Sequence, residues 1–254
     1  PEGQIVALIG PNGAGKTTVF NLLTKVYQPT AGAILLDGKD THSMTTAQVN
    51  KAGIARTFQN IRLFSDLTVA ENLMVAMNDS VRYGLAGSIL HFPRYAREEH
   101  IARERTEELL SIFHMESHAD ERAGSLPYGA QRRLEIVRAL ATHPKLLLLD
   151  EPAAGMNPHE TEELMENITK IRDQFHIAIL LIHHLRKMND DDPMNMISGT
   201  TGISGATDSN FVLKERRRGS GEATLYCTGR DIEYRELPLV FDKSGYTWRL
   251  TEPV

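Results

Sequence analysis

A chain of 254 residues can bury one sizeable core, so its length predicts one large α/β domain that can carry an inserted subdomain. The formal net charge of -5 and the pI near 6.1 exclude a bulk attraction to nucleic acid or anionic lipid, so any such binding has to come from a local patch. The single cysteine, Cys227, cannot form an internal disulfide, and no stretch has the apolar length of a membrane span or signal peptide. We therefore expect a cytoplasmic protein.

The first two thirds of the chain alternate between strand-like and helix-like patterns. Residues 4–9 are a short apolar run before a glycine-rich turn, which predicts a buried strand feeding a helix. A capping box that begins at Thr68, and apolar residues at helical spacing, predict a mostly helical insertion over about 65–125. The remaining patterns predict helices over 15–26, 132–141 and 160–175, and strands over 33–38, 53–58, 145–149 and 177–182. This alternation predicts a parallel sheet.

The pattern changes after His184. An acidic loop over 190–193 and a run of small residues over 198–206 are typical of loop or short helix. Alternating or apolar runs near 210–214, 222–228, 235–241 and 246–250 then predict successive antiparallel strands, with Cys227 and Trp248 in the core. The basic cluster over 214–219 lies between two of these strands. We interpret it as a solvated hairpin tip, and a contact with a phosphate backbone is the alternative.

Residues 10–17 match the motif G-x-x-x-x-G-K-[ST], and they lie between a predicted strand and a predicted helix. Glycines in such a loop let backbone N–H groups surround a β-phosphate, and Lys16 places a charge on the β/γ oxygens. The residues expected to bind ATP are Asn12, Gly13, Gly15, Lys16, Thr17 and Thr18. The alternative is a glycine-rich turn without a ligand, but the spacing and the position between a strand and a helix favour the phosphate-binding loop.

Two adjacent carboxylates, Asp150 and Glu151, end an apolar strand. Asp150 and Thr17 supply the oxygen ligands that Mg²⁺ prefers, and Glu151 can polarise the attacking water. A solvated acidic pair is the alternative, but beside a phosphate-binding loop two such acids suit hydrolysis of ATP.

Three further segments resemble the ATPase subunit of an ABC transporter. Residues 125–135 resemble the signature segment, 150–158 the Walker B and D-loop pair, and 56–59 the Q-loop. Residues 1 to about 182 look like the ATPase subunit of a branched-chain amino-acid importer. The resemblance implies a three-layer α/β P-loop fold with a mainly parallel sheet, a helical insertion and C-terminal antiparallel strands.

The resemblance also implies roles and partners. Gln59 would sense the γ-phosphate and ligate Mg²⁺, and His184 would be the switch histidine, with capping of the strand end as its alternative. Gly129 of one subunit would cover the ATP bound at the P-loop of a second copy. The helical insertion would meet membrane subunits, which places the parent family at the inner face of the cell membrane. The family's signature serine is Pro127 here, so we expect mainly a monomer.

The C-terminal segment is different. Residues 183–187, 197–202 and 228–231 resemble the RecA-like core of RepA-type hexameric helicases, in which a late arginine reaches a neighbour's phosphate; Arg230 matches it loosely. We interpret the chain as a recombined, engineered chimaera joined near residues 180–184. The expected domains are a P-loop core over 1–64 and 126–184, a helical subdomain over 65–125, and C-terminal strands over 185–254.

Three functions compete on this evidence. The first is an ABC-type ATPase, the second a helicase-like ATPase stimulated by DNA, and the third an ATP-binding scaffold with little turnover. The motifs favour ATP chemistry over transport or unwinding.

Overall fold

The computed structural model describes residues 2–77, 93–184, 200–217, 219–245 and 247–251. The chain divides into two compact units, which are described separately. The first unit comprises residues 1–27 and 148–254, and the second comprises residues 28–147. None of the described helices combines the length and the hydropathy needed to cross a membrane.

The first unit is built on a sheet whose central strand is β1 (Ile5–Gly10). β1 pairs in parallel with β6 (Ala178–His184) on one side and with β7 (Ser209–Glu215) on the other. Beyond β7 the strands are antiparallel: β8 (Glu222–Gly229), β9 (Arg235–Asp242) and β10 (Thr247–Leu250). The parallel strands therefore all end at one edge of the sheet.

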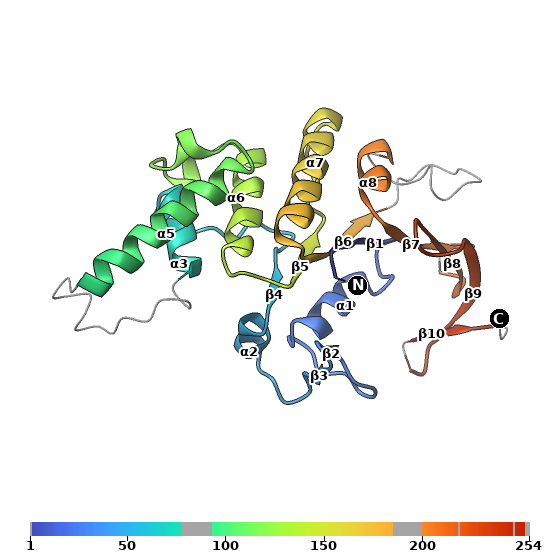
Figure 1. The fold of residues 1–254 in the computed structure, drawn as a ribbon. Coiled ribbons are helices and arrows are strands. Elements are labelled where there is room, and N and C mark those ends of the chain that lie inside the picture. The colour runs from blue at the N-terminus through green and yellow to red at the C-terminus, as the bar shows by residue number, and fades with distance from the viewer. Residues whose placement is uncertain (1, 78–92, 185–199, 218, 246, 252–254) are drawn as a thin grey trace. The chain divides into compact units, whose positions relative to one another are not determined.

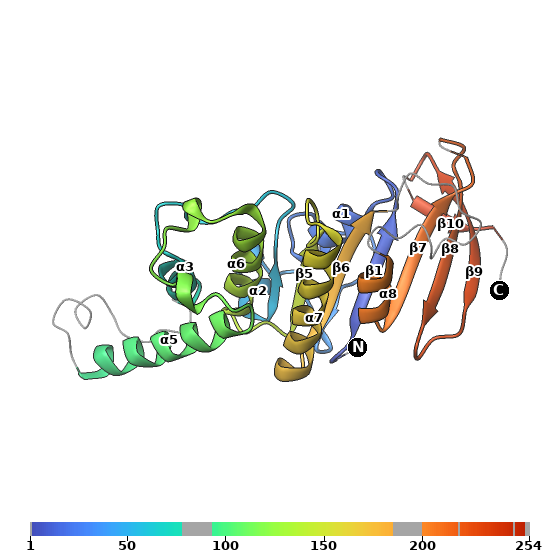
Figure 2. The same ribbon diagram turned by 90° about the horizontal axis from the view of Figure 1, so that it is seen from above.

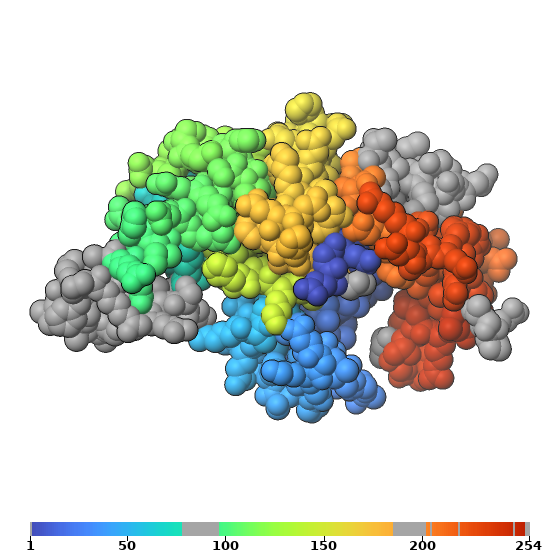
Figure 3. All heavy atoms as spheres, viewed as in Figure 1, coloured from blue at the N-terminus to red at the C-terminus, as the bar shows by residue number. Residues whose placement is uncertain are grey.

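Helices cover both faces of this sheet. Helix α1 (Lys16–Leu23) lies on one face, and α7 (Pro158–Phe175) and α8 (Thr200–Ala206) lie on the other (Figure 1). The views in Figures 2 and 3 agree that α7, in yellow, and α8, in orange, lie side by side. A capping box starts α7: the backbone N–H of Glu160 donates to Asn157 Oδ1, and the N–H of Asn157 donates to Glu160 Oε2, each at 2.9 Å.

Apolar side chains hold the helices on the sheet. Leu164, Ile168 and Ile171 are spaced so that they share one face of α7, and all are at most 1% exposed. On the strands, Ile5, Ala7 and Leu181 are 0% exposed. The burial of this layer fixes the strands that carry the site.

The second unit is mainly helical. Its helices are α2 (Thr46–Lys51), α3 (Val69–Met77), α5 (Pro93–Ser111) and α6 (Tyr128–Leu140), with single 3₁₀ turns at Glu116–His118 and Ala123–Ser125. Strands β2 (Leu35–Leu36) and β3 (Lys39–Asp40) form a hairpin, and β4 (Ile54–Arg56) follows α2. Strand β5 (Leu146–Asp150) crosses the boundary: residues 146–147 belong to this unit and 148–150 to the first. Leu73, Leu109 and Leu134 are 0% exposed and form the core between α3, α5 and α6.

Most predicted elements are confirmed, including the parallel sheet and its antiparallel extension. The capping box is also confirmed, because Thr68 N–H donates to Glu71 Oε2 at 2.8 Å and Glu71 N–H donates to Thr68 Oγ1 at 3.1 Å. Helix α1 ends at Leu23 rather than Val26, since Lys25 adopts a left-handed backbone with φ of 59°. Helix α6 starts at Tyr128, four residues before the predicted start, directly after Pro127.

Two predictions for the C-terminal strands need correction. The first of the four strands, β7, is antiparallel to β8 as predicted, but it also pairs in parallel with β1. Trp248 is half-buried rather than in the core, and its ring meets Phe241 edge-on at 5.1 Å. The acidic loop predicted over 190–193 lies outside the described residues.

Candidate nucleotide-binding site

The phosphate-binding loop connects β1 to α1 in the first unit. Gly13 and Gly15 have φ of 84° and 86°, which favours glycine at both positions. Gly15 is the N-cap of α1, and its carbonyl oxygen accepts from the N–H of Val19 at 3.0 Å. The free N–H groups of the first helical turn therefore face the loop, where they favour an anion.

Lys16 is folded over this loop. Its Nζ donates to the carbonyl oxygens of Gly10 at 2.7 Å and of Pro11 at 2.9 Å. Burial lowers the pKa of Lys16, and the negative charges of Glu151 and Asp150 oppose this effect. A triphosphate in the loop would compensate the half-buried ammonium group.

Glu151 and His184 meet beside Lys16. Glu151 follows β5 with φ of 49°, a strained conformation for a residue other than glycine, and its N–H donates to Ile182 O at 3.1 Å. Its carboxylate contacts His184 Nε2 at the end of β6, while His184 Nδ1 lies 3.4 Å from Lys16 Nζ. The tautomer with the proton on Nε2 satisfies both contacts, because Nε2 then donates to the carboxylate and Nδ1 can accept from the ammonium group. The structure thus brings together three of the predicted site residues.

The other predicted ligands of the first unit lie at the same edge of the sheet. Asn12, Thr17 and Thr18 are exposed on the loop and the start of α1, whereas Asp150 ends β5 and is 3% exposed. Within the described ranges, no cluster of three or more histidine, cysteine or acidic side chains could hold a metal ion. Thr17 and Asp150 supply a hydroxyl and a carboxylate oxygen, which suits Mg²⁺ because this ion usually takes few protein ligands together with phosphate oxygens.

Gln59 and Gly129 belong to the second unit, so their predicted approach to a nucleotide stays a prediction. Gln59 is exposed just after β4. Gly129 lies in the first turn of α6, whose N-cap, Pro127, makes no side-chain capping hydrogen bond. The signature segment therefore offers backbone N–H groups at a helix start, without a hydroxyl at the N-cap.

Sequence reasoning missed two residues that hold the Q-loop. Arg132 and Glu135 of α6 are 0% and 2% exposed and form an ion pair at 2.8 Å. Arg132 donates to the carbonyl oxygen of Phe58, and Glu135 Oε1 accepts from the N–H of Phe58 at 3.3 Å. The only sequence signal is the Arg-x-x-Glu spacing, which puts both side chains on one face of the helix.

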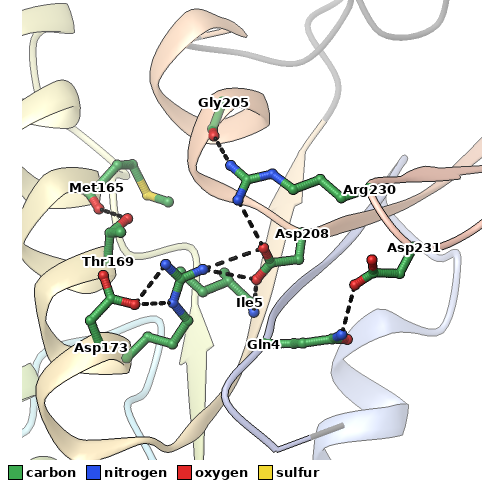
Figure 4. A network of polar contacts seen from close by, with 10 residues as sticks. Gln4, Ile5, Met165, Thr169, Asp173, Gly205, Asp208, Arg230 and Asp231 are labelled. Carbon is green, nitrogen blue, oxygen red and sulfur yellow. Dashed lines mark hydrogen bonds and ion pairs between the residues drawn. The ribbon is translucent and has the colours of Figure 1, made fainter.

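Arg230, matched loosely to the helicase arginine, lies at the edge of the sheet opposite the P-loop. β8 is antiparallel to β7, and Gly229 pairs with Ser209, so Arg230 is near the start of β1 rather than near the P-loop. Its guanidinium group is 3.4 Å from Asp208 Oδ1 and donates to Gly205 O at 3.5 Å (Figure 4). A contact of Arg230 with a neighbouring copy's phosphate stays a prediction.

Comparisons with known proteins agree with this geometry. The family model described as ABC transporter matches residues 1–154. The chain is 45% identical over 187 residues to the high-affinity branched-chain amino acid transport ATP-binding protein BraF of Pseudomonas aeruginosa, covering 74% of this chain and 73% of the relative. It is 44% identical over 206 residues to LivG of Escherichia coli, covering 80% and 81%.

A solved structure gives the same result for the fold. The ADP conformation of MJ1267, an ATP-binding cassette of an ABC transporter, aligns with a TM-score of 0.64 at 27% identity, covering 83% of this chain and 76% of that chain. Residues 1–154, which the family model matches, include the P-loop, the acidic strand end and the signature segment. The chain belongs to the ABC transporter family, as one of its ATPases.

Proposed function

We propose that the chain binds ATP with Mg²⁺ and hydrolyses it as the ATPase subunit of a branched-chain amino-acid importer. The observation that carries the ATPase assignment is the meeting of Lys16, Glu151 and His184 beside the P-loop. The transported substrate is inferred from the printed names of BraF and LivG, with which the chain shares 45% and 44% identity.

Lys16, Glu151 and His184 each have a distinct role. The ammonium group of Lys16 turns from the loop carbonyls to the β/γ-phosphate oxygens and offsets their charge. The Glu151 carboxylate orients a water molecule and accepts its proton as the water oxygen attacks the γ-phosphorus and ADP leaves. His184 holds the Glu151 carboxylate and contacts Lys16, so it orients the base relative to the phosphates.

Thr17 and Asp150 are the proposed Mg²⁺ ligands of the first unit. The bound ion would neutralise part of the phosphate charge and orient the terminal phosphates. Gln59 is proposed as a further ligand and as the sensor of the γ-phosphate.

A groove in the second unit is the proposed docking surface for the membrane subunits. Its volume is about 580 Å³, and its lining joins the Q-loop segment to α3 and α6. The lining residues are Phe58, Arg62, Leu63, Phe64, Val75, Ala76 and Arg138. Phe64 and Val75 are 50% and 47% exposed, and a partner that covers them would gain apolar burial. Docking here would hold the chain at the inner face of the membrane. A movement of the membrane subunits would then shift the Q-loop segment and, with it, Gln59.

The comparisons give no support to a helicase-like segment at about residues 183–254, or to the interpretation of the chain as an engineered chimaera. The family model ends at residue 154, and BraF, LivG and MJ1267 are all transporter proteins by their printed names. The proposed function therefore takes nothing from the helicase resemblance, and nucleic acid is not a proposed partner.

The test is release of inorganic phosphate from ATP by the purified chain, with and without Mg²⁺ and single-stranded DNA. We expect turnover that requires Mg²⁺, is lost in Glu151→Gln and does not respond to DNA. ATP binding without turnover would support the scaffold alternative, and stimulation by DNA would support the helicase alternative.

A further inference from the structure

The hairpin between β7 and β8 rises from the same edge of the sheet as the P-loop. β7 runs parallel to β1, with Ile9 opposite Val212, so both strands end at this edge (Figure 2). The strands are close there, because a Cβ on Gly10 would lie 3.3 Å from Leu213 Cβ. The chain that follows Leu213 therefore starts directly beside the phosphate-binding loop.

The catalytic groups show which way a nucleotide must run across the P-loop. Glu151 follows β5, and His184 is the last residue of β6. Strand β6 pairs with β1 on the side opposite β7, with Gly10 opposite His184. The γ-phosphate has to face Glu151 and His184 for the attack of water. Since the β-phosphate is held above the end of β1, the nucleoside end points away from β6 and toward β7.

The β7–β8 hairpin extends far enough beyond the end of β1 to contact a nucleoside on the β7 side of the P-loop. Arg216 is four residues beyond Val212, so the strand can carry it about 13 Å past the level of Ile9, at roughly 3.3 Å per residue. The N–H of Arg216 donates to Glu222 O at 2.9 Å, and the N–H of Ser220 donates to Arg217 O at 3.0 Å. The hydrogen bonds between β7 and β8, together with those of this turn, keep the hairpin extended beside the P-loop.

Two arginines of the tip are available to a ligand. Arg216 and Arg217 are both exposed, and the side chain of Arg216 is 81% accessible. The ion pair of Arg216 with Glu222, at 3.4 Å, is exposed and therefore weak enough for the guanidinium group to turn. A guanidinium group can stack on a purine ring and donate hydrogen bonds to ribose hydroxyls or base acceptors.

We propose that the β7–β8 hairpin is the nucleoside wall of this ATPase, with Arg216 and Arg217 contacting the ribose and base of the nucleotide. The inference rests on the proposed ATPase function and adds the part of the site that recognises the nucleoside. It assigns a function to the basic cluster that the phosphate chemistry leaves unused, and the solvated hairpin tip is the alternative.

The experiment compares two ligands that differ only by the nucleoside end. Affinities for ATP and for inorganic tripolyphosphate are measured by calorimetry on the parent chain and on Arg216→Ala/Arg217→Ala. We expect ATP affinity to fall about tenfold, the scale of one or two desolvated guanidinium contacts, while tripolyphosphate affinity stays unchanged. Arg216→Lys/Arg217→Lys keeps the charge but loses the planar group, and we expect it to recover less than half of the lost binding free energy.

A matched control removes the same charge elsewhere in the first unit. Arg235 and Arg249 are also exposed, with side chains 60% and 71% accessible, and neither lies in the β7–β8 hairpin. Arg235→Ala/Arg249→Ala should bind both ligands as the parent does. Unchanged ATP affinity in the hairpin variant would overturn the proposal, and so would an equal loss for both ligands, because that result places the arginines on the phosphates. If Lys16→Ala binds ATP with the affinity of the parent chain, the proposed function itself is overturned.

Discussion

Asp208 accepts a hydrogen bond from the backbone N–H of Ile5 at 2.8 Å, although the two residues are 203 positions apart. The same carboxylate lies 3.0 Å from Arg172 Nη1 and 3.4 Å from Arg230 Nη1, and its side chain is only 10% exposed (Figure 4). Burial lowers the pKa of Arg172, but hydrogen bonds and charges from Asp173 and Asp208 outweigh this and raise the pKa overall. One carboxylate therefore joins the start of β1, helix α7 and the end of β8.

Removing this carboxylate should destabilise the first unit. Asp208→Ala leaves the N–H of Ile5 and the mostly buried Arg172 without their shared acceptor, and we expect a loss of about 2–4 kcal/mol of unfolding free energy. Urea unfolding followed by circular dichroism measures the change. Asp231→Ala is the control. Its hydrogen bond with Gln4, at 3.1 Å, is exposed, and its loss should cost less than about 0.5 kcal/mol. Equal effects of the two substitutions would contradict this role of Asp208.

The sequence predicted the elements that local patterns determine. The P-loop between β1 and α1, the capping box at Thr68 and the buried strand before Asp150 depend on residues close together in the chain. Contacts between distant segments were not predictable. Nothing in the sequence pairs β7 with β1, or places Arg132 against Phe58, 74 positions away. Such pairings depend on which surfaces meet in the folded chain, and a periodic pattern records only which side of an element is buried.

Lys16→Ala should abolish detectable ATP binding. The substitution removes the cation that offsets the β/γ-phosphate charge but keeps the glycines that shape the loop. Titration calorimetry with Mg-ATP measures the affinity, and an unchanged thermal unfolding curve controls for folding. Binding at the parent affinity would refute the assignment of the P-loop.

Glu151→Gln should keep ATP and Mg²⁺ binding and lower turnover by about 10²-fold or more, as expected for loss of a general base. The amide cannot accept the proton of the attacking water, although it can still hydrogen-bond to His184. Phosphate release and ATP titration on the same preparation separate the two effects. If the variant and the parent turn over at the same rate, another group is the base.

The buried Arg132–Glu135 pair should control the Q-loop. Glu135→Ala leaves the fully buried Arg132 without its carboxylate partner, which costs about 3–5 kcal/mol for a buried pair, and it removes the acceptor for Phe58 N–H. We expect faster hydrogen exchange over residues 57–60 in the variant. Glu121→Ala is the control in the same unit, since its ion pair with His118 is half exposed. Exchange that is equally slow in both variants would show that the pair does not hold the Q-loop.

The last prediction concerns assembly. In the ABC family, the signature segment of one subunit covers the γ-phosphate bound to the other. Here the position of the family's signature serine is Pro127, the N-cap of α6, which has no side-chain hydroxyl. We therefore expect a chain that is mainly monomeric with ATP, at 28.4 kDa, and binds it at micromolar or weaker affinity, about -8 kcal/mol or less in magnitude. Glu151→Gln blocks hydrolysis, so light scattering with Mg-ATP would detect any dimer that ATP holds together. Adding Pro127→Ser to Glu151→Gln restores a hydroxyl at the N-cap, and we expect this double variant to dimerise with ATP more than Glu151→Gln alone. A stable dimer of Glu151→Gln alone would mean that backbone N–H groups near Gly129 suffice for the contact, and a hexamer would point to the helicase-like assembly.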